Sequence, residues 1–252
     1  ETSYGQSIIS LDFLKNTSLK EKDESNVSDD SFSSNSIFYE LDKLRNKADE
    51  NNPIKSLGIF HDYISDVDIV FCTDMDTEPA DFILSSPTKQ VFVHVKCGKT
   101  KNPKSSAGAI SEVGGQAIKN LEMTISHNNR LTPANRTRLL GKWPSPNATN
   151  TLQDRIRLFN GKRYDSKNVD SIENEKKIDE VWSVIADRRK SPIVKNEIWI
   201  IVGRAFSRQH FIKQLNEGSK AEAESLQAFQ LIDSWRITAA SLDAELKFFV
   251  SP

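Results

Sequence analysis

Residues 68–120 read DIVFCTDMDTEPADFILSSPTKQVFVHVKCGKTKNPKSSAGAISEVGGQAIKN, and this stretch decides the fold. Two short apolar runs, residues 80–84 and 91–97, are separated by SSPTKQ, whose serines, proline and lysine are typical of a turn between paired strands. A lysine-rich loop follows, and beyond it the apolar residues recur at helical spacing. The stretch therefore predicts two neighbouring strands, a loop and a helix, in that order.

The rest of the chain contains both continuous apolar runs, which are typical of buried strands, and apolar residues repeated at helical spacing. Further strands are predicted where apolar residues run together, at residues 68–73, 197–204 and 246–252. Helices are predicted where apolar residues recur every three or four positions, at residues 37–50, 177–191, 206–218 and 221–243. Ser36 is a suitable N-cap for the first of these helices, and Gly218 is a suitable C-cap for the third. The pattern predicts an α/β fold with a mixed central β-sheet flanked by helices.

Composition predicts a boundary near residue 36. Residues 1–36 are expected to form an N-terminal segment and a polar, acidic, serine-rich linker, and residues 37–252 the main domain. Within that domain, residues 127–196 are rich in arginine, lysine and asparagine and form a possible insertion. This region is either a nucleic-acid contact, with an aromatic such as Trp143 or Tyr164 available for stacking, or a plain surface subdomain.

Charge, cysteine content and the length of the apolar runs argue against several classes of protein. The chain has 252 residues, a formal net charge of −1 and two cysteines, Cys72 and Cys97. So few cysteines argue against a disulfide scaffold or a zinc finger and predict a reducing, cytoplasmic setting. No apolar run reaches the roughly 18 residues of a membrane span, and no signal peptide is recognised, so no membrane partner is expected. With a net charge near zero, binding to nucleic acid must depend on local basic patches.

The two central strands carry the candidate chemistry. Because side chains alternate along a strand, His94 and Lys96 share one face, and Asp81 begins the preceding strand beside them. Hydrolysis of a phosphodiester needs a hard cation on carboxylate oxygens and a positive group that stabilises charge on the phosphate. Asp81 and Lys96 fit these two roles. The alternatives are a core histidine at position 94 and a structural ion pair between Asp81 and Lys96.

Acidic and basic residues surround this centre. Glu78, with Asp74 and Asp76 before it, either supports a metal site or forms a turn. The loop after the second strand is a candidate phosphate-binding patch or an ordinary solvated loop, and its lysines are Lys99, Lys101 and Lys104. The helix that follows carries Glu112, Gln116 and Lys119, of which Lys119 is a further candidate contact to nucleic acid.

Two adjacent glycines, Gly114 and Gly115, interrupt the same helix. Each costs about 1 kcal/mol relative to alanine inside a helix. We therefore expect them to mark close packing or the close approach of another backbone.

Three phrases together resemble the PD-(D/E)XK nuclease superfamily: TDMDTEPADFI at residues 73–83, VFVHVK at residues 91–96, and SAGAISEVGGQAIKNL at residues 106–121. They also look like a nuclease-like domain attached to DEAD/DEAH-box helicases of bacterial defence systems. The later runs EIWIIVGR and LKFFVSP look like the same group. The resemblance covers roughly residues 37–252, and its central third is the specific part.

The resemblance implies a role for each matching residue. Asp81 would bind the metal, Lys96 would be the catalytic lysine, and Gln116 would contact the site or the substrate. His94 occupies the place of the second acid, and Ala80 that of the proline in the superfamily name. A glutamate of the first helix often completes the metal site, which makes Glu40 a candidate, although a glutamate near a helix N-terminus is also favourable by itself.

The function implied by the resemblance is that of a divalent-metal-dependent endonuclease cleaving DNA with Mg²⁺ or Mn²⁺. It would act in antiviral defence or restriction, with a helicase domain or subunit. The main alternative is a catalytically silent nuclease fold that binds DNA or a partner protein and positions a helicase. A third possibility is a metal-free regulatory domain.

Overall fold

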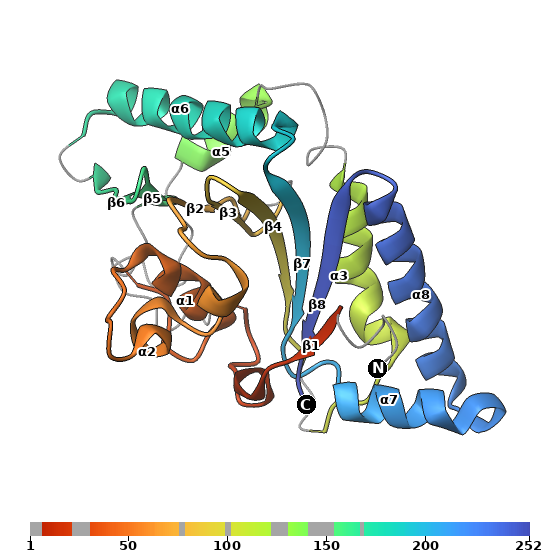
Figure 1. The fold of residues 1–252 in the computed structure, drawn as a ribbon. Helices are drawn as coiled ribbons and strands as arrows, with labels where there is room; N and C mark the ends of the chain where they lie inside the picture. Colours follow the sequence, from red (N-terminus) through yellow and green to blue (C-terminus); the bar gives the residue numbers. More distant parts are fainter. Residues whose placement is uncertain are drawn as a thin grey trace. The chain divides into compact units, whose positions relative to one another are not determined.

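The structure is a computed structural model that describes residues 7–21, 31–75, 79–98, 102–121, 131–140, 154–166 and 169–252. It confirms the predicted fold class, because helices flank a mixed sheet of eight strands in the order β1-β8-β7-β4-β3-β2-β5-β6 (Figure 1). The chain forms two compact units. Unit 1 comprises Glu1–Glu21, Val93–Leu121 and Glu197–Pro252, and unit 2 comprises Lys22–Phe92 and Glu122–Asn196.

Unit 1 contains a run of parallel strands. Its elements are β1 (Ile8–Ser10), the 3-10 helix η1 (Asp12–Lys15), the end of β4 (Lys89–Lys96), α3 (Ala107–Lys119), β7 (Lys195–Val202), α7 (Arg208–Glu217), η6 (Gly218–Lys220), α8 (Ala223–Ala240) and β8 (Ala244–Val250). Strand β1 pairs with β8 in parallel. The N–H groups of residues 195 and 203 donate to the carbonyl oxygens of residues 88 and 96. Strands β4 and β7 therefore also run parallel, and their carboxyl ends are neighbours.

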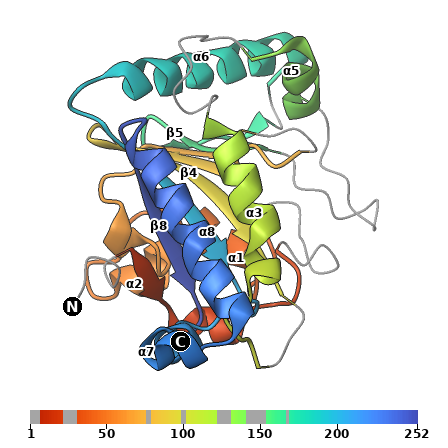
Figure 2. The ribbon, with the colours of Figure 1, turned by 90° about the vertical axis from the view of Figure 1, so that its right-hand side faces the viewer.

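Helices α3 and α8 cover one face of the sheet in unit 1 (Figure 2). Alternate residues of β7 and β8 point into this core, among them Ile198, Ile200 and Phe248. The helices approach each other closely at Gly114, where an added Cβ atom would lie 2.1 Å from the ring of Trp235. This contact confirms the expected close packing at Gly114, and it explains why a residue without a side chain stands there. At Gly115 the expectation is wrong, because an added Cβ atom would meet nothing within 4 Å.

Unit 2 is built on antiparallel pairs. Its elements are α1 (Ile37–Asp42), η3 (Lys43–Arg45), α2 (Pro53–Leu57), η4 (His61–Tyr63), β2 (Ile69–Cys72), β3 (Phe82–Ser85), the start of β4, α5 (Pro133–Leu140), β5 (Ile156–Phe159), β6 (Lys162–Arg163) and α6 (Ser171–Lys190). Strand β2 pairs with both β3 and β5. Asn160 and Gly161 join β5 to β6 with φ angles of 51° and 69°, as a two-residue Asn-Gly hairpin turn requires. Apolar residues of α6 pack on one face of these strands.

A buried ion cluster holds α1 to β5. Arg157 donates from Nε and Nη2 to the two carboxylate oxygens of Asp42, at 2.7 and 2.9 Å, and its side chain is 1% exposed. Arg45 approaches the same carboxylate at 3.1 Å. The ring of Phe32 lies 5.7 Å from the Arg157 guanidinium and packs edge-on against Phe38. These contacts fix the first helix of unit 2 on the sheet.

The structure corrects two local predictions. The first helix has six residues rather than fourteen, because the chain tightens into η3 at Lys43. The expected linker is not wholly solvated, since Phe32 is buried, while residues 22–30 lie outside the described part. Within the N-terminal segment, Ile8–Ser10 form β1, which pairs with β8 of unit 1, and Asp12–Lys15 form η1. The boundary at residue 36 and the insertion at residues 127–196 stay predictions, and the contacts group the chain differently.

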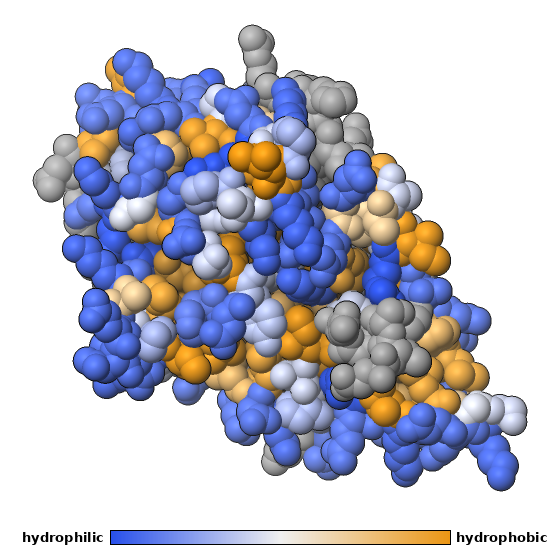
Figure 3. All heavy atoms as spheres, in the orientation of Figure 1, coloured by the Kyte–Doolittle hydropathy of each residue, from blue (hydrophilic) through white to orange (hydrophobic). Residues whose placement is uncertain are grey.

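Polar residues dominate the molecular face drawn in Figure 3, with smaller groups of hydrophobic residues between them. The most exposed large apolar side chains of the described ranges are scattered over both units: Leu19, Ile54, Ile172, Ile193, Leu226 and Ile237. Within those ranges, no helix has the length and apolar character needed to cross a membrane.

Candidate functional site

Strand β4 ends at the predicted catalytic lysine. Its sequence, KQVFVHVK, is rich in β-branched and aromatic residues that favour a strand, and six of its eight residues are buried. Lys96, the last residue, has a side chain that is 34% exposed. The strand therefore carries a primary amine from a buried backbone out to solvent at the carboxyl edge of the sheet.

Glu112 of α3 forms an ion pair with this lysine. The Lys96 Nζ atom lies 2.9 Å from Glu112 Oε1, and the glutamate side chain is 62% exposed. Partly exposed pairs of this kind contribute roughly 0–1 kcal/mol to stability. The pair can therefore open at little cost when another charged group enters.

Gln116 and Lys119 continue the exposed face of α3. Both side chains are exposed, and the spacing of 112, 116 and 119 places the three residues on one side of the helix. Gly115 lies beside them, and an added Cβ atom there would meet nothing within 4 Å. Lys96, Glu112 and Gln116 thus form an open polar surface in unit 1, which we call the Lys96 surface.

His94 lies two residues before Lys96 and is buried, with 3% of its surface exposed. Burial lowers the pKa of its imidazole to about 4, so the ring is neutral at pH 7. A neutral imidazole is the form that can bind a metal, and it is also the form that packs in a core. The metal-ligand role of His94 stays a prediction.

Asp81 is a residue of unit 2, immediately before β3, and it is partly buried. Its backbone carbonyl accepts hydrogen bonds from the N–H of Thr73, at 2.9 Å, and from the thiol of Cys72, at 3.3 Å. These bonds fix the start of β3. The predicted metal-binding role of its carboxylate stays a prediction.

The structure gives Glu40 a clear local role. Its Oε2 atom accepts the N–H of Ile59 at 3.2 Å, and its Oε1 atom lies 2.6 Å from Lys43 Nζ. Gly58, with a φ angle of 80°, packs so closely that a Cβ atom there would lie 2.5 Å from the Glu40 carbonyl oxygen. The Glu40 carboxylate therefore holds the turn at residues 58–59.

The described residues contain no group of three or more His, Cys, Asp and Glu side chains placed to hold a metal ion. Asp81, His94 and Glu40 therefore do not form such a group, and Glu78 lies outside the described ranges together with Asp76. Mg²⁺ in phosphoryl chemistry is often bound by only one or two carboxylates, with water and substrate oxygens completing its shell. A site with one or two protein carboxylates is therefore the kind of metal site that the predicted ligands could form.

The end of the basic loop is tied to α7 and α8. Lys104 Nζ lies 3.0 Å from Glu222 Oε1, and this hydrogen bond lowers the pKa of Glu222. Ser105 Oγ lies 2.9 Å from His210 Nδ1 and 2.7 Å from Ser225 Oγ. Lys104 thus has an acidic neighbour that sequence reasoning missed, because Glu222 follows 118 positions later. Lys99 and Lys101 lie outside the described residues.

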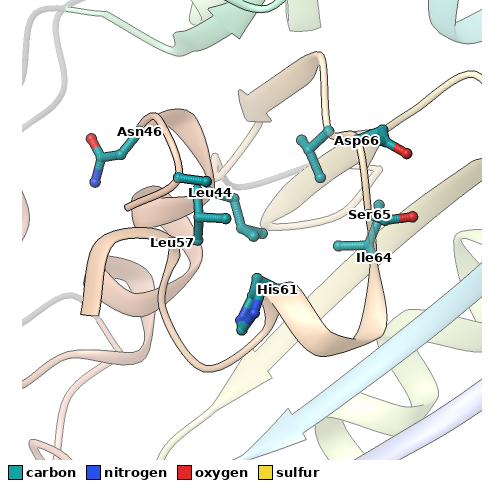
Figure 4. A pocket seen from close by; sticks show the side chains of 9 residues that line it. Leu44, Asn46, Leu57, His61, Ile64, Ser65 and Asp66 are labelled. Atoms are coloured by element: carbon teal, nitrogen blue, oxygen red, sulfur yellow. The ribbon is translucent and has the colours of Figure 1, made fainter. Parts of the chain in front are cut away.

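The described residues of unit 2 line at least two small hollows. One, of about 310 Å³, is shown in Figure 4, with Leu44 and Leu57 on one side, Ile64 and Asp66 on the other, and His61 between them. The Nδ1 atom of His61 lies 3.0 Å from the carbonyl oxygen of Gly58, which fixes the ring.

The second hollow, of about 340 Å³, lies beside the β5–β6 turn and is lined by Phe159, Asn160, Lys162, Arg163, Tyr164 and Lys177. Burial, with the charges of Asp154 and Glu173, raises the pKa of Tyr164 to about 12. Its hydroxyl donates to Asn174 Oδ1 at 2.9 Å, so Tyr164 has a structural partner.

Comparison with known proteins gives no relative. No protein-family model, curated protein or solved structure matches the chain.

The Lys96 surface is the arrangement in unit 1 best suited to chemistry on a phosphate. It offers a cation, a carboxylate and an amide on rigid elements, with an open approach along α3. These groups can bind an anion, stabilise negative charge and accept or deliver a proton.

Proposed function

We propose that the chain is a divalent-metal-dependent nuclease that hydrolyses DNA phosphodiester bonds, with a restriction-endonuclease-like core. The observation that supports this most is the position of Lys96. Lys96 is the last residue of the buried strand β4, and its Nζ atom lies 2.9 Å from Glu112 Oε1. Gln116 lies one helical turn after Glu112 on α3. That order of elements matches the order that the superfamily resemblance implies.

In this proposal Lys96 stabilises the negative charge that develops on the phosphate. Glu112 holds the lysine extended before substrate binds and accepts its hydrogen bond. Gln116 offers an amide to a phosphate or a sugar. Asp81 is the proposed ligand of Mg²⁺ or Mn²⁺, with Glu78 and His94 as proposed supporting ligands. When bound, the cation would lower the pKa of a water molecule and neutralise charge on the phosphate.

The biological setting is part of the same proposal. The resemblance points to a helicase domain or subunit as partner, and to antiviral defence or restriction as the process. In this proposal DNA is the substrate, and the helicase would expose it to the nuclease.

A second candidate is a silent nuclease fold that binds DNA or a partner protein without cutting. Two observations favour it. The described residues contain no three-ligand metal group, and the carboxylate of Glu40 is occupied by Lys43 and Ile59.

Cleavage of plasmid and linear DNA with Mg²⁺ or Mn²⁺ separates these candidates. The comparison uses wild type, Asp81→Ala and Lys96→Ala, with Lys213→Ala as control because that lysine is 72% exposed on α7. We expect metal-dependent cutting that falls at least about 100-fold in the first two variants and is retained in the control. Cutting that survives both changes would move the site elsewhere. Binding without cutting by the wild type would favour the silent fold.

A further inference from the structure

Arg204 lies on a tight turn that is fixed to the end of β4. The N–H of Gly203 donates to the carbonyl oxygen of Lys96 at 2.9 Å, and the N–H of Ala205 donates to Gly203 at 2.8 Å. On the other side, a Cβ atom at Gly98 would lie 2.5 Å from the Cα atom of Ala205. The residue before Arg204 therefore contacts the last residue of β4, and the residue after it packs against Gly98 just beyond the strand, so the turn that carries Arg204 lies at the carboxyl end of β4.

The guanidinium of Arg204 has no partner within the part of the chain that the structure describes. Its Nε atom is shielded from solvent and makes no hydrogen bond there, and the residue is only partly exposed. Every other arginine in that part has at least one hydrogen bond, ion pair, ring contact or electrostatic interaction. Because the residue is partly exposed, an external anion can reach the guanidinium and accept from its buried Nε donor.

The location and the chemistry of Arg204 indicate which anion. In α/β proteins, ligands bind beyond the carboxyl ends of parallel strands, which is where this turn lies. The planar guanidinium matches phosphate oxygens with paired donors, better than a lysine does. We propose that Arg204 binds a backbone phosphate of the nucleic acid, next to the phosphate that Lys96 contacts. The identity of this ligand rests on the proposed nuclease function, whereas the observation that the Arg204 Nε atom has no hydrogen-bond partner among the described residues does not.

The test measures DNA binding and stability together. A fluorescein-labelled DNA oligonucleotide is titrated with wild type, Arg204→Met, Arg204→Lys and the control Lys213→Met in EDTA, at several salt concentrations. For Arg204→Met we expect affinity to fall about tenfold and the slope of log K against log salt to become shallower by about one. Arg204→Lys should keep the slope and lose part of the affinity, because it keeps the charge without the paired donors. The control should change affinity less than about twofold.

Thermal unfolding separates ligand binding from a structural role. Because Arg204→Met loses no contact of the guanidinium with the described residues, we expect its Tm to equal or exceed that of the wild type. A Tm lowered by several degrees would overturn the inference, since it would show that the arginine stabilises the fold.

The outcomes for the two proposals differ. DNA binding that is unchanged in Arg204→Met, with cleavage by the wild type intact, overturns the role of Arg204 and leaves the nuclease standing. Binding that depends on Arg204 in a protein that never cuts supports the phosphate contact and contradicts the nuclease. If the wild type binds neither DNA nor inorganic phosphate, the inference about Arg204 fails.

Discussion

Two ion pairs of this protein, Asp42–Arg157 and Lys96–Glu112, join opposite charges in different environments. In unit 2, Asp42 and Arg157 form a bidentate pair whose side chains are 3% and 1% exposed. In unit 1, Lys96 and Glu112 meet through one hydrogen bond, with side chains 34% and 62% exposed. The first pair is enclosed and joins a helix to a strand, while the second lies open at the end of a strand. Burial and geometry, rather than the presence of opposite charges, separate a structural pair from one that is available for chemistry.

The largest effect is expected from breaking the enclosed pair. Asp42→Ala leaves Arg157 and Arg45 buried without their carboxylate, and removing one partner of a buried pair costs about 3–5 kcal/mol. Denaturant unfolding monitored by circular dichroism measures this loss. Glu112→Ala is the matched control, with an expected change below about 1 kcal/mol. Equal effects of the two changes would contradict the comparison.

The same contrast occurs along β4 between His94 and Lys96. The pKa of His94 is lowered from 6.5 to about 4 in the folded protein, whereas the unfolded chain has the ordinary value. The unfolded state therefore binds a proton between these pH values when the folded state does not, and stability falls as pH decreases from about 6.5 to 4. The expected loss approaches about 3 kcal/mol.

Unfolding free energies measured from pH 7 to pH 4 test this dependence. His94→Leu serves as the comparison, because it removes the titrating group and should remove this part of the pH dependence. An identical pH profile for wild type and His94→Leu would show that the imidazole is not held neutral.

Helix α3 repeats the contrast with two adjacent glycines. Gly114→Ala places a methyl group against the Trp235 ring and should destabilise by about 1–3 kcal/mol through overpacking. Gly115→Ala adds the same methyl group over open space and should stabilise by about 0.5–1 kcal/mol. Thermal unfolding of both variants measures whether each substitution raises or lowers stability. A loss for Gly114→Ala with a gain for Gly115→Ala would support the packing described, and changes in the same direction would contradict it.

Much of the fold could be predicted from the sequence because it depends on local patterns. The apolar runs at β2, β4 and β7 and the helical spacing in α3 and α8 each lie within one short segment. Alternation predicts that His94 and Lys96 share one face of a strand, and β4 spans both residues. Phe32 was missed because a single aromatic in a polar run gives no periodic signal.

The candidate site was harder to predict because its contacts join distant segments. The Glu112 contact needed the packing of α3 beside β4, although its place on the helix after a strand-end lysine was a usable signal. Arg204 needed the parallel pairing of β4 and β7, which no local pattern encodes. The local role of Glu40 depends on the N–H of a residue nineteen positions later.

The most direct test of the account measures cleavage and stability of Lys96→Met side by side. Metal-dependent DNA cleavage is assayed on the same protein samples whose unfolding free energies are determined. The account predicts cleavage reduced at least about 100-fold, with stability within about 1 kcal/mol of wild type, because the Lys96–Glu112 pair is open and weak. Retained cleavage, or a loss of stability as large as that of Asp42→Ala, would contradict the claim that Lys96 is held for chemistry rather than for the fold.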